Sequence, residues 1–400
     1  MQRVLFLSNG HGEDICNSQI LKSFTELQPE AKVAAMPIVG DGDAYRRLGV
    51  PIIGPTSRMP SGGVFYMNPL FFLKDIKEGL VSLTCQQLKA MRAYCPKCDL
   101  MVATGDIVVA AIACLMQRPF VVFLSAYSSY YEGKLRLGFL NWQLLNSPRC
   151  LRVFTRDAFT AWDLNQQGLT KAEFVGTPVM DTLSPTGIDL QLTPGVPAIA
   201  LLPGSRLPEA SHNLRLQLQL AQKIAQVMDP LPVQFRAALI PSLMSELDAI
   251  ASALNWQHQA GKLFKKYTTD SQPKTVEVHC YSEAFADILQ QSNLVIGQTG
   301  TAVEQAVGLG KPVITIPGAG PAFTYRFAEA QQRLLGSSVQ VIGTQPATPK
   351  ILQEAAERVK LSLLDSNYLE TCLQNGFERM GPSGGSIKIA QYLENYLQSC

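Results

Sequence analysis

The residues best suited to chemistry lie in two short stretches in the second half of the chain. The first, residues 197–209 (PAIALLPGSRLPE), leads from an apolar strand into a turn that contains Arg206. The second, residues 292–318, has an apolar strand, a turn around Gly300 and a helical pattern that includes Glu304. A strand, a glycine-bearing turn and a helix N-terminus together expose main-chain N–H groups and the positive end of a helix dipole. Both turns therefore favour a phosphate or pyrophosphate group, and together they indicate a nucleotide site.

Arg206 and Glu304 suit the two ends of a nucleoside diphosphate. The planar guanidinium of Arg206 can hold two phosphate oxygens at once, and so can stabilise a departing diphosphate. The carboxylate of Glu304 lies one helical turn beyond Gly300 and can accept both hydroxyl groups of a ribose. Two plainer interpretations stay open. One is an ordinary loop in which Arg206 pairs with Glu209, and the other is a helix-terminal carboxylate that only favours the dipole.

A polar, glycine-bearing turn also follows the first predicted strand, at residues 9–14 (NGHGED). His11 in this turn is a candidate general base, because a histidine titrates near neutral pH. Asp106, in the turn after the third strand, is the rival candidate, with a helix N-cap as its alternative role. Asp14 is a third candidate, which helix capping alone would also explain. The alternative interpretation is that His11 is only an exposed residue of this turn.

Strands alternate with helices along the whole chain, which predicts parallel sheets with helices on both faces. Because 400 residues are too many for one core, we expect an α/β protein of two doubly wound, Rossmann-like domains that face each other across a cleft. The predicted parts are a first domain at 1–183, a linker at 184–196, a second domain at 197–378 and a C-terminal helix at 379–400 that crosses back to the first domain. The predicted strands are 4–7, 33–38, 100–103, 120–124, 151–154 and 173–175, then segments near 199, 234–238, 276–279, 294–296, 313–316 and 339–342.

Composition narrows the classes of function. Hydrophobic residues make up 46% of the chain, as in a globular protein, and the net charge of +2 argues against nucleic-acid binding. No apolar run reaches the length of about 18 residues that a membrane span needs. The chain opens in a strand at 3–8 rather than an export signal, so its nine cysteines are expected to be reduced thiols of a cytoplasmic protein. Cys95 and Cys98 form a single CxxC pair, which falls short of the four ligands of a structural zinc site, so we expect no metal.

One segment of the first domain could rest on a lipid surface. Residues 59–80 are apolar and aromatic, most of all at 65–73, and they lie beside or include Arg58, Lys74 and Lys77. A basic and aromatic segment of this kind suits a membrane interface. A helix packed into the core of the first domain is the alternative interpretation.

Four stretches of the chain resemble lipid A disaccharide synthase, in the same order along the sequence. They are 4–24 (VLFLSNGHGEDICNSQILKSF), 173–181 (EFVGTPVMD), 198–209 (AIALLPGSRLPE) and 293–329 (NLVIGQTGTAVEQAVGLGKPVITIPGAGPAFTYRFAE). The chain looks most like the divergent, synthase-related branch found in photosynthetic bacteria. The resemblance implies an inverting glycosyltransferase of the GT-B fold, which uses a UDP-linked sugar and needs no bound metal.

The resemblance also implies which residues meet each substrate. The donor residues are Gly204, Ser205 and Arg206 in the first turn, and Gln298, Thr299, Gly300, Thr301, Ala302 and Glu304 in the second. On the acceptor side we single out Gly10, Gly12, Ser125 and Tyr131, of which Ser125 matches a serine after the fourth strand. This side departs from the family pattern, since Gly105 stands where the family has an acidic residue, one place before Asp106. Residues 126–131 replace an expected Pro and Trp, and an expected asparagine has no counterpart in 343–349.

We therefore expect a glycosyltransferase that moves a sugar from a UDP-sugar to a lipid or lipid-linked acceptor at the cytoplasmic face of the membrane. We expect no cofactor, because the UDP-sugar is a substrate, and no nucleic-acid partner. Two alternatives stay open. One is an enzyme like UDP-N-acetylglucosamine 2-epimerase, which shares the two-domain architecture. The other is a non-catalytic protein that binds a sugar nucleotide or a lipid.

Overall fold

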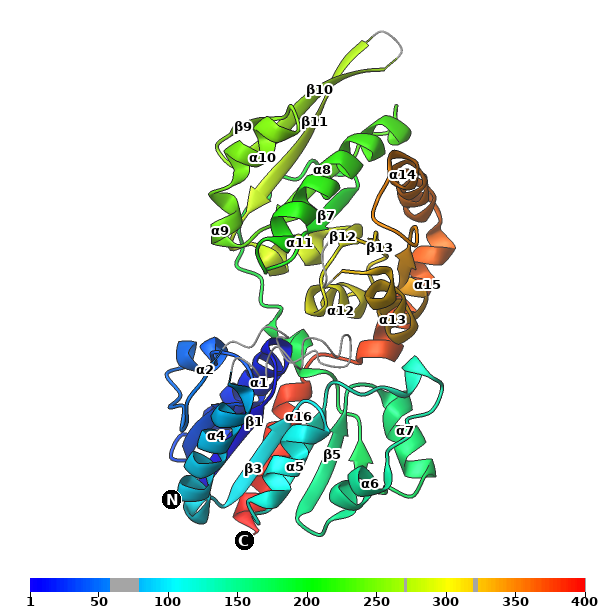
Figure 1. Cartoon of the computed structure of the whole chain (residues 1–400). Coiled ribbons are helices and arrows are strands. Elements are labelled where there is room, and N and C mark those ends of the chain that lie inside the picture. The colour runs from blue at the N-terminus through cyan, green and yellow to red at the C-terminus, as the bar shows by residue number, and fades with distance from the viewer. Residues whose placement is uncertain (58–78, 270–271, 319–322, 400) are drawn as a thin grey trace. The chain divides into compact units, whose positions relative to one another are not determined.

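The computed structural model describes residues 1–57, 79–269, 272–318 and 323–399. The chain divides into two compact units, which are described separately (Figure 1). Unit 1 comprises Met1–Thr182 and Gly381–Cys400, and unit 2 comprises Leu183–Met380.

Unit 1 is built on a six-stranded parallel sheet with the order β2-β1-β3-β4-β5-β6. Its strands are β1 (Arg3–Ser8), β2 (Lys32–Pro37), β3 (Leu100–Thr104), β4 (Phe120–Leu124), β5 (Cys150–Thr155) and β6 (Ala172–Glu173). A single parallel bridge between Ala35 and Ile52 continues the sheet beyond β2. The central strands β3 and β4 are buried along their whole length, as the unbroken apolar runs of their sequences predict.

Helices cover both faces of this sheet. The helices are α1 (His11–Leu27), α2 (Asp43–Arg47), α4 (Leu80–Tyr94), α5 (Ile107–Leu115), α6 (Phe139–Asn146), α7 (Ala158–Gln166) and α16 (Gly385–Gln398). Leu5 and Leu7 of β1 pack in one core cluster with residues of α4, α5 and α6, whereas Phe6 between them meets Phe24 of α1. Successive side chains of a strand point to opposite faces, so β1 helps to build both cores. Helix α16 packs against α1, where Gln28 donates to Glu394 at 2.7 Å.

Unit 2 contains an eight-stranded sheet with the order β14-β13-β12-β7-β8-β11-β10-β9. Its strands are β7 (Ala198–Leu202), β8 (Gln234–Ala238), β9 (Gln257–Gln259), β10 (Lys262–Thr269), β11 (Gln272–Tyr281), β12 (Leu294–Gly297), β13 (Val313–Thr315) and β14 (Val339–Val341). Six of the strands are parallel, but β10 runs antiparallel to β11 and β9 antiparallel to β10. The prediction of parallel strands is therefore wrong for this edge, because β10 and β11 follow each other directly as a hairpin, without the helix that a parallel crossover requires.

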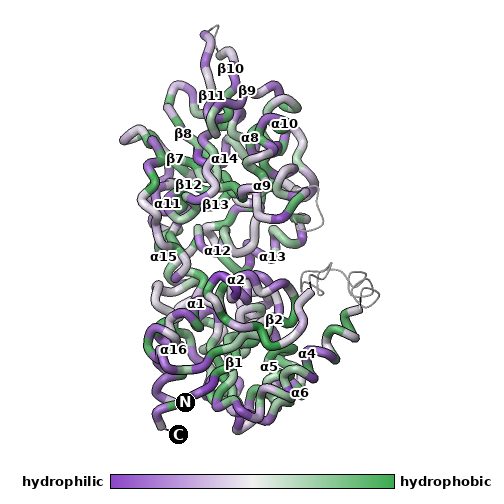
Figure 2. The backbone as a smooth tube through the Cα atoms, turned by 90° about the vertical axis from the view of Figure 1, so that its left-hand side faces the viewer, coloured by the Kyte–Doolittle hydropathy of each residue, from purple (hydrophilic) through white to green (hydrophobic). Residues whose placement is uncertain are grey.

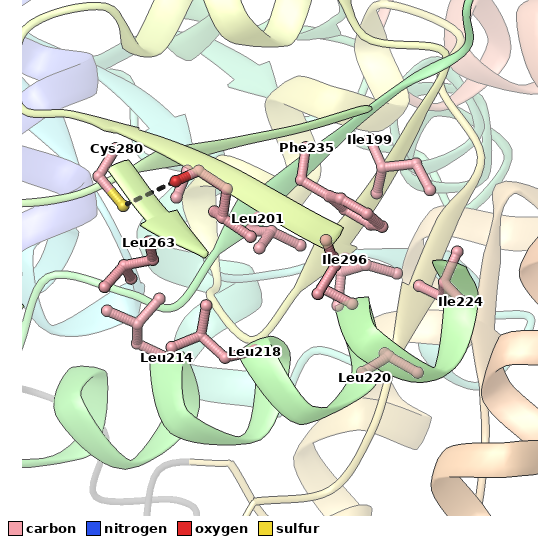
Figure 3. Packing of buried hydrophobic residues seen from close by; sticks show 14 of the residues in the cluster. Ile199, Leu201, Leu214, Leu218, Leu220, Ile224, Phe235, Leu263, Cys280 and Ile296 are labelled. Carbon is pink, nitrogen blue, oxygen red and sulfur yellow. Dashed lines mark hydrogen bonds between the residues drawn. The ribbon is translucent and has the colours of Figure 1, made fainter. Parts of the chain in front are cut away.

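The helices of unit 2 are α8 (Glu209–Met228), α9 (Pro241–Met244), α10 (Leu247–Ala253), α11 (Phe285–Gln291), α12 (Thr301–Gly308), α13 (Tyr325–Leu335), α14 (Pro349–Leu364) and α15 (Ser366–Met380). Figure 3 shows how Leu214 and Leu218 of α8 point toward the sheet residues Leu201 and Ile296 in the core. With two Rossmann-like parallel sheets covered by helices, the predicted α/β fold class is confirmed.

Residues 184–196, which we predicted to be an interdomain linker, are held on unit 2. Asp287 of α11 accepts the main-chain N–H groups of Thr186 (3.0 Å) and Gly187 (2.9 Å). The buried guanidinium of Arg236 on β8 donates to the carbonyl oxygen atoms of Leu190 (2.6 Å) and Gln191 (2.5 Å). Asp287 and Arg236 therefore satisfy four main-chain groups of this segment.

Hydrophobic residues gather in strands such as β1, whereas the hairpin β10–β11 and outer helices such as α16 carry many hydrophilic residues (Figure 2). Within the described ranges, no helix is both long enough and apolar enough to cross a bilayer. The segment 59–80, for which we predicted a lipid surface or a core helix, lies almost wholly outside the described residues, as do Arg58, Lys74 and Lys77.

Candidate functional site

Each sheet contains two neighbouring strands from which the chain continues in opposite directions across the sheet. In unit 2 these strands are β7, which continues toward β8, and β12, which continues toward β13. In unit 1 they are β1, which continues toward β2, and β3, which continues toward β4. The loops after such strands diverge and leave room for a ligand at the carboxyl ends of the strands. All the predicted donor residues follow β7 or β12, and all three predicted catalytic residues follow β1 or β3.

The loops after β7 and β12 approach each other at Gly204. This glycine has a φ of +111°, and a Cβ atom there would lie 3.7 Å from both the carbonyl oxygen of Gln298 and the Cγ2 atom of Thr299. Glycine is the residue that adopts this conformation without strain. Ser205 and Arg206 follow immediately and are exposed. The structure therefore brings the two predicted phosphate-binding turns together, with the guanidinium of Arg206 available to solvent.

The turn before α12 leaves main-chain groups available at a helix N-terminus. Gly300 occupies the N-cap position and has no side chain that could cap the helix. Its carbonyl oxygen accepts the N–H groups of Val303 (3.1 Å) and Glu304 (3.3 Å), which starts the helix. Thr301, Ala302 and Glu304 are half-buried in this first turn. The N–H groups that open the helix, together with the dipole, form the setting in which proteins hold phosphate.

Three buried polar side chains that the sequence analysis missed hold these loops in place. Gln331 of α13 donates to the carbonyl oxygen atoms of Thr299 (3.0 Å) and Gly300 (3.1 Å). Asn213 of α8 donates to Pro203 O at 2.9 Å, and Gln217 donates to Gln298 Oε1 at 3.2 Å. The available signal was the presence of amides among the apolar residues of α8 and α13. Amides buried in this way are expected to be hydrogen-bonded, and here they fix the turns.

Gln298 itself is a supporting residue. Its side chain is buried and donates to Ile316 O at 3.0 Å, in addition to accepting from Gln217. We had predicted Gln298 as a donor-binding residue, and its side chain faces the interior of unit 2. Any contact to a ligand at this position would therefore come from the neighbouring main chain.

In unit 1 the loops after β1, β3 and β4 meet at Gly105. This residue has a φ of +142°, and a Cβ atom there would collide with Oδ1 of Asn9 in the loop after β1. The carbonyl oxygen of Gly105 accepts the N–H group of Ala126 at 3.4 Å, beyond the end of β4. Ser125 therefore lies beside the same loop, with its Oγ atom buried and its carbonyl oxygen bonded to Arg156 at 3.0 Å.

Asp106 is the N-cap of α5. Its Oδ1 atom accepts the N–H group of Val108 at 2.8 Å, which is the alternative role that the sequence left open. Burial raises the pKa of Asp106, while hydrogen bonds from the main-chain N–H groups of Val108 and Val109 and from Asn9 oppose the rise. Asp106, whose carboxyl group caps α5, is half-buried at the edge of the sheet.

His11 is the first residue of α1 and is exposed, with Gly10 at the N-cap and Gly12 after it. Asp14, in the same helical turn, is buried and accepts a 2.6 Å hydrogen bond from Ser8 Oγ. Burial is the main cause that raises the pKa of Asp14 to about 7, although the bond from Ser8 lowers it. An exposed imidazole and a buried carboxyl with a near-neutral pKa thus share one turn.

Tyr131 lies in a short 3-10 helix, η3 (Ser129–Tyr131), and is half-buried. The neighbouring Ser128 and Ser129 donate to Asp157 (2.7 Å) and Asp163 (2.6 Å), so α7 holds this segment. The run 126–131 therefore lies on the β4–β5 side of the sheet, whereas the turn of His11 follows β1.

Comparison with known proteins identifies solved structures that share the architecture of this chain. No family model matches the chain, and no curated protein does. Among solved structures, MurG of Acinetobacter baumannii is similar over all of both chains, with 15% identity and a TM-score of 0.57. UDP-GlcNAc 2-epimerase from Neisseria meningitidis, bound to UDP-GlcNAc, is also similar over all of both chains, with 14% identity and a TM-score of 0.54. MnaA of S. aureus, in a structure with UDP, is similar over 100% of this chain and 98% of its own, with 13% identity and a TM-score of 0.57. The chain has the GT-B fold.

Proposed function

We propose that this protein is a glycosyltransferase that moves a sugar from a UDP-sugar to a lipid or lipid-linked acceptor, as its resemblance to lipid A disaccharide synthase implies. The observation that carries the proposal is the junction at Gly204, where the turn of Arg206 meets the turn before α12. MurG, which shares the GT-B fold, and the UDP-bound neighbours support a nucleotide site in this architecture.

In this proposal the donor is bound by unit 2. Arg206 and the N-terminal N–H groups of α12 hold the diphosphate, and they stabilise the negative charge that develops as UDP departs. Glu304, half-buried in the first turn of α12, binds the ribose. Ser205, Thr299, Thr301 and Ala302 line the same turns. The group that leaves is an anion, so a cation and a helix dipole supply the stabilisation that the reaction needs.

Activation of the acceptor hydroxyl is assigned to unit 1. His11 is the preferred base, because it is exposed in the turn after β1 and imidazole accepts protons near neutral pH. Asp106 is the second candidate, since one carboxyl oxygen caps α5 while burial raises its pKa. We expect His11→Ala or Asp106→Asn to abolish turnover without changing the affinity for UDP. Wild-type turnover in both variants would contradict the assignment.

A lipid-linked acceptor is supported by an exposed apolar site at the start of α6. Phe139 and Leu140 are 73% and 76% exposed, and the exposed basic residues Lys134 and Arg136 precede them. Adjacent apolar and cationic side chains suit the surface of an anionic bilayer. We therefore propose a cytoplasmic protein that binds the membrane peripherally, with segment 65–73 as a further candidate contact.

The decisive experiment is calorimetric titration of UDP into the wild type and the Arg206→Ala variant. Loss of a charge-assisted hydrogen bond costs about 1.5–3 kcal/mol, so the affinity should fall roughly 10- to 150-fold. Arg358→Ala is the matched control, because Arg358 is an exposed arginine on α14 of the same unit. Equal affinities of the Arg206→Ala variant and the wild type would refute the donor site.

The solved 2-epimerase structures favour one second candidate, an epimerase that acts on a UDP-sugar. Incubation with UDP-GlcNAc and no acceptor separates the two functions. An epimerase converts the sugar nucleotide to its C2 epimer without releasing a transferred sugar, whereas the glycosyltransferase leaves that stereocentre unchanged. Tight UDP binding without either product would indicate the non-catalytic alternative.

A further inference from the structure

A chain of hydrogen bonds runs through the interior of unit 1 and ends at Asp14. Ser8 Oγ at the end of β1 donates to Asp14 Oδ1 at 2.6 Å, and it lies 2.5 Å from the hydroxyl of Tyr45 on α2. Asn17 Nδ2 on α1 lies 3.0 Å from the same hydroxyl, and Thr104 Oγ1 at the end of β3 donates to Asn17 Oδ1 at 2.9 Å. All five side chains are buried, so their hydrogen bonds to one another decide where the hydroxyl protons lie.

The direction of this chain is set by one main-chain group. Asn17 Nδ2 also donates to the carbonyl oxygen of Leu7 at 3.0 Å, and a carbonyl can only accept. The amide nitrogen of Asn17 is therefore on the side of Tyr45, and the hydroxyl of Tyr45 accepts from it. If Tyr45 also accepted from Ser8, the buried phenol proton would have no acceptor among the hydrogen bonds of the described residues, so the satisfied arrangement has Tyr45 donating to Ser8 and Ser8 donating to Asp14. Every donor in the chain points toward the carboxyl group.

This direction determines which oxygen of Asp14 can carry a proton. Oδ1 is an acceptor for Ser8, so a proton bound to Asp14 must sit on Oδ2. Oδ2 lies toward Gly40, after β2, where a Cβ atom would be 3.6 Å away. Gly40 has a φ of +113°, which also favours glycine. Asp14 Oδ2, the oxygen that must hold the proton, thus faces Gly40, which has no side chain.

The charges around Asp14 are negative. Glu13 on the same helix, Asp43 on α2 and Asp41 after β2 each raise the pKa of Asp14, in addition to its burial. Tyr45 is held neutral, because burial and Asp14 both raise its pKa. Two further elements pack on α1: η4 (Pro178–Thr182), whose Asp181 accepts N–H groups of Gly384 and Ser386, and α16, which carries Lys388, Tyr392, Glu394 and Tyr396.

We propose that Asp14 Oδ2 is a proton-binding site of unit 1, and that Asp14 is a positioning residue that makes the turn of His11 respond to pH. The second part rests on the function proposed above. Asp14 N–H donates to Gly10 O at 2.8 Å, so the carboxyl belongs to the helical turn that His11 opens. Residues three apart on a helix are neighbours, and a carboxylate there favours the protonated imidazole. As pH rises, Oδ2 releases its proton to solvent, and the resulting charge strengthens His11 as a base.

The first test is a pH titration of the full-length protein with 13C-labelled aspartate carboxyl groups, followed by NMR. The resonance that is lost in Asp14→Asn identifies Asp14, and we expect its midpoint near neutral pH. Ser8→Ala removes the bond that stabilises the carboxylate, so the midpoint should rise by about one pH unit. Asp43→Asn removes a negative neighbour and should lower the midpoint, as a control of opposite sign. Ser8→Thr keeps a hydroxyl and should restore the wild-type value, which separates lost hydrogen bonding from misfolding.

A midpoint near that of an exposed aspartate, or one that does not move in Ser8→Ala, would overturn the proton-binding site. The second test is the pH profile of kcat for sugar transfer, whose acidic limb should move in the same direction as the midpoint in each variant. An unmoved profile beside a shifted midpoint would overturn the positioning role. If UDP titration and sugar transfer both fail, the proposed function is wrong, while the NMR titration still decides the proton-binding site.

Discussion

The Asp14→Asn substitution should remove a pH dependence from the stability of unit 1. The pKa of Asp14 rises from 3.8 to about 7 in the folded protein. A raised pKa means that the folded state binds the proton more tightly, so this contribution is complete below the unfolded pKa and is lost as pH rises through about 7. The full contribution is about 4 kcal/mol, of which about 2.5 kcal/mol is lost between pH 5 and pH 8, at about 1.4 kcal/mol per pH unit.

Asparagine is a close mimic of Asp14 protonated on Oδ2. Its Oδ1 can still accept from Ser8, and its Nδ2 replaces the protonated oxygen that faces Gly40. The variant should therefore resemble the wild type at pH 5 and should not lose the stability that the wild type loses by pH 8. The difference between the two pH dependences should be about 2.5 kcal/mol.

The assay is guanidinium unfolding at pH 5 and pH 8 in a Trp256→Phe background. The remaining tryptophans, Trp142 and Trp162, are both in unit 1, so their fluorescence reports on this unit alone. Asp43→Asn is the control, because it removes a carboxylate of α2 and leaves Asp14 free to titrate. Equal pH dependences in Asp14→Asn and the Trp256→Phe parent would refute the reasoning.

Three further predictions concern other parts of the molecule. Gly105→Ala forces a Cβ atom against Asn9 at a φ of +142° and should destabilise unit 1 by about 1–3 kcal/mol, measured by the same tryptophan fluorescence. The control Gly133→Ala, at a position with open space around it, should destabilise unit 1 less. Asp287→Ala leaves main-chain N–H groups of residues 186–187 without their acceptor and should cost unit 2 about 2–4 kcal/mol in denaturant unfolding. Because hydrogen bonds lower the pKa of Asp287, this contribution should be lost as pH falls below about 4, and a wild-type acid limb in the variant would contradict it. Replacing Phe139 and Leu140 by serine should reduce flotation with anionic vesicles at low salt, whereas serines at the exposed Leu361 and Leu364 should not.

Much of the fold follows from local patterns. The strands β3, β4, β7 and β12 are short apolar runs, and the helices after β3 and β12 begin at the N-cap residues Asp106 and Gly300. The two roles left open for Asp106 show the limit of such patterns. A side chain that precedes an apolar helix can cap it, and only the 2.8 Å contact with Val108 establishes that it does.

The candidate site was only partly predictable. The turns of Arg206 and Gly300 were readable because helix N-termini and glycines act through their neighbours in sequence. The supporting amides Gln331 and Asn213 were not, since an amide among the apolar residues of a helix does not reveal which group it bonds to. The burial of the Gln298 side chain was not predictable for the same reason, so a ligand contact at this position would involve its main chain.

Local sequence patterns thus predict the alternation of strands and helices, the two glycine-bearing turns of unit 2 and the candidate base in the turn after β1. The tertiary structure alone decided that Thr104 reaches Asn17 across 87 residues of sequence, and that Tyr45 joins Ser8 to Asp14. It also decided that β10 turns back as an antiparallel edge. Local propensity depends on residues a few positions apart, whereas the pKa of a carboxyl depends on every group that folding brings around it.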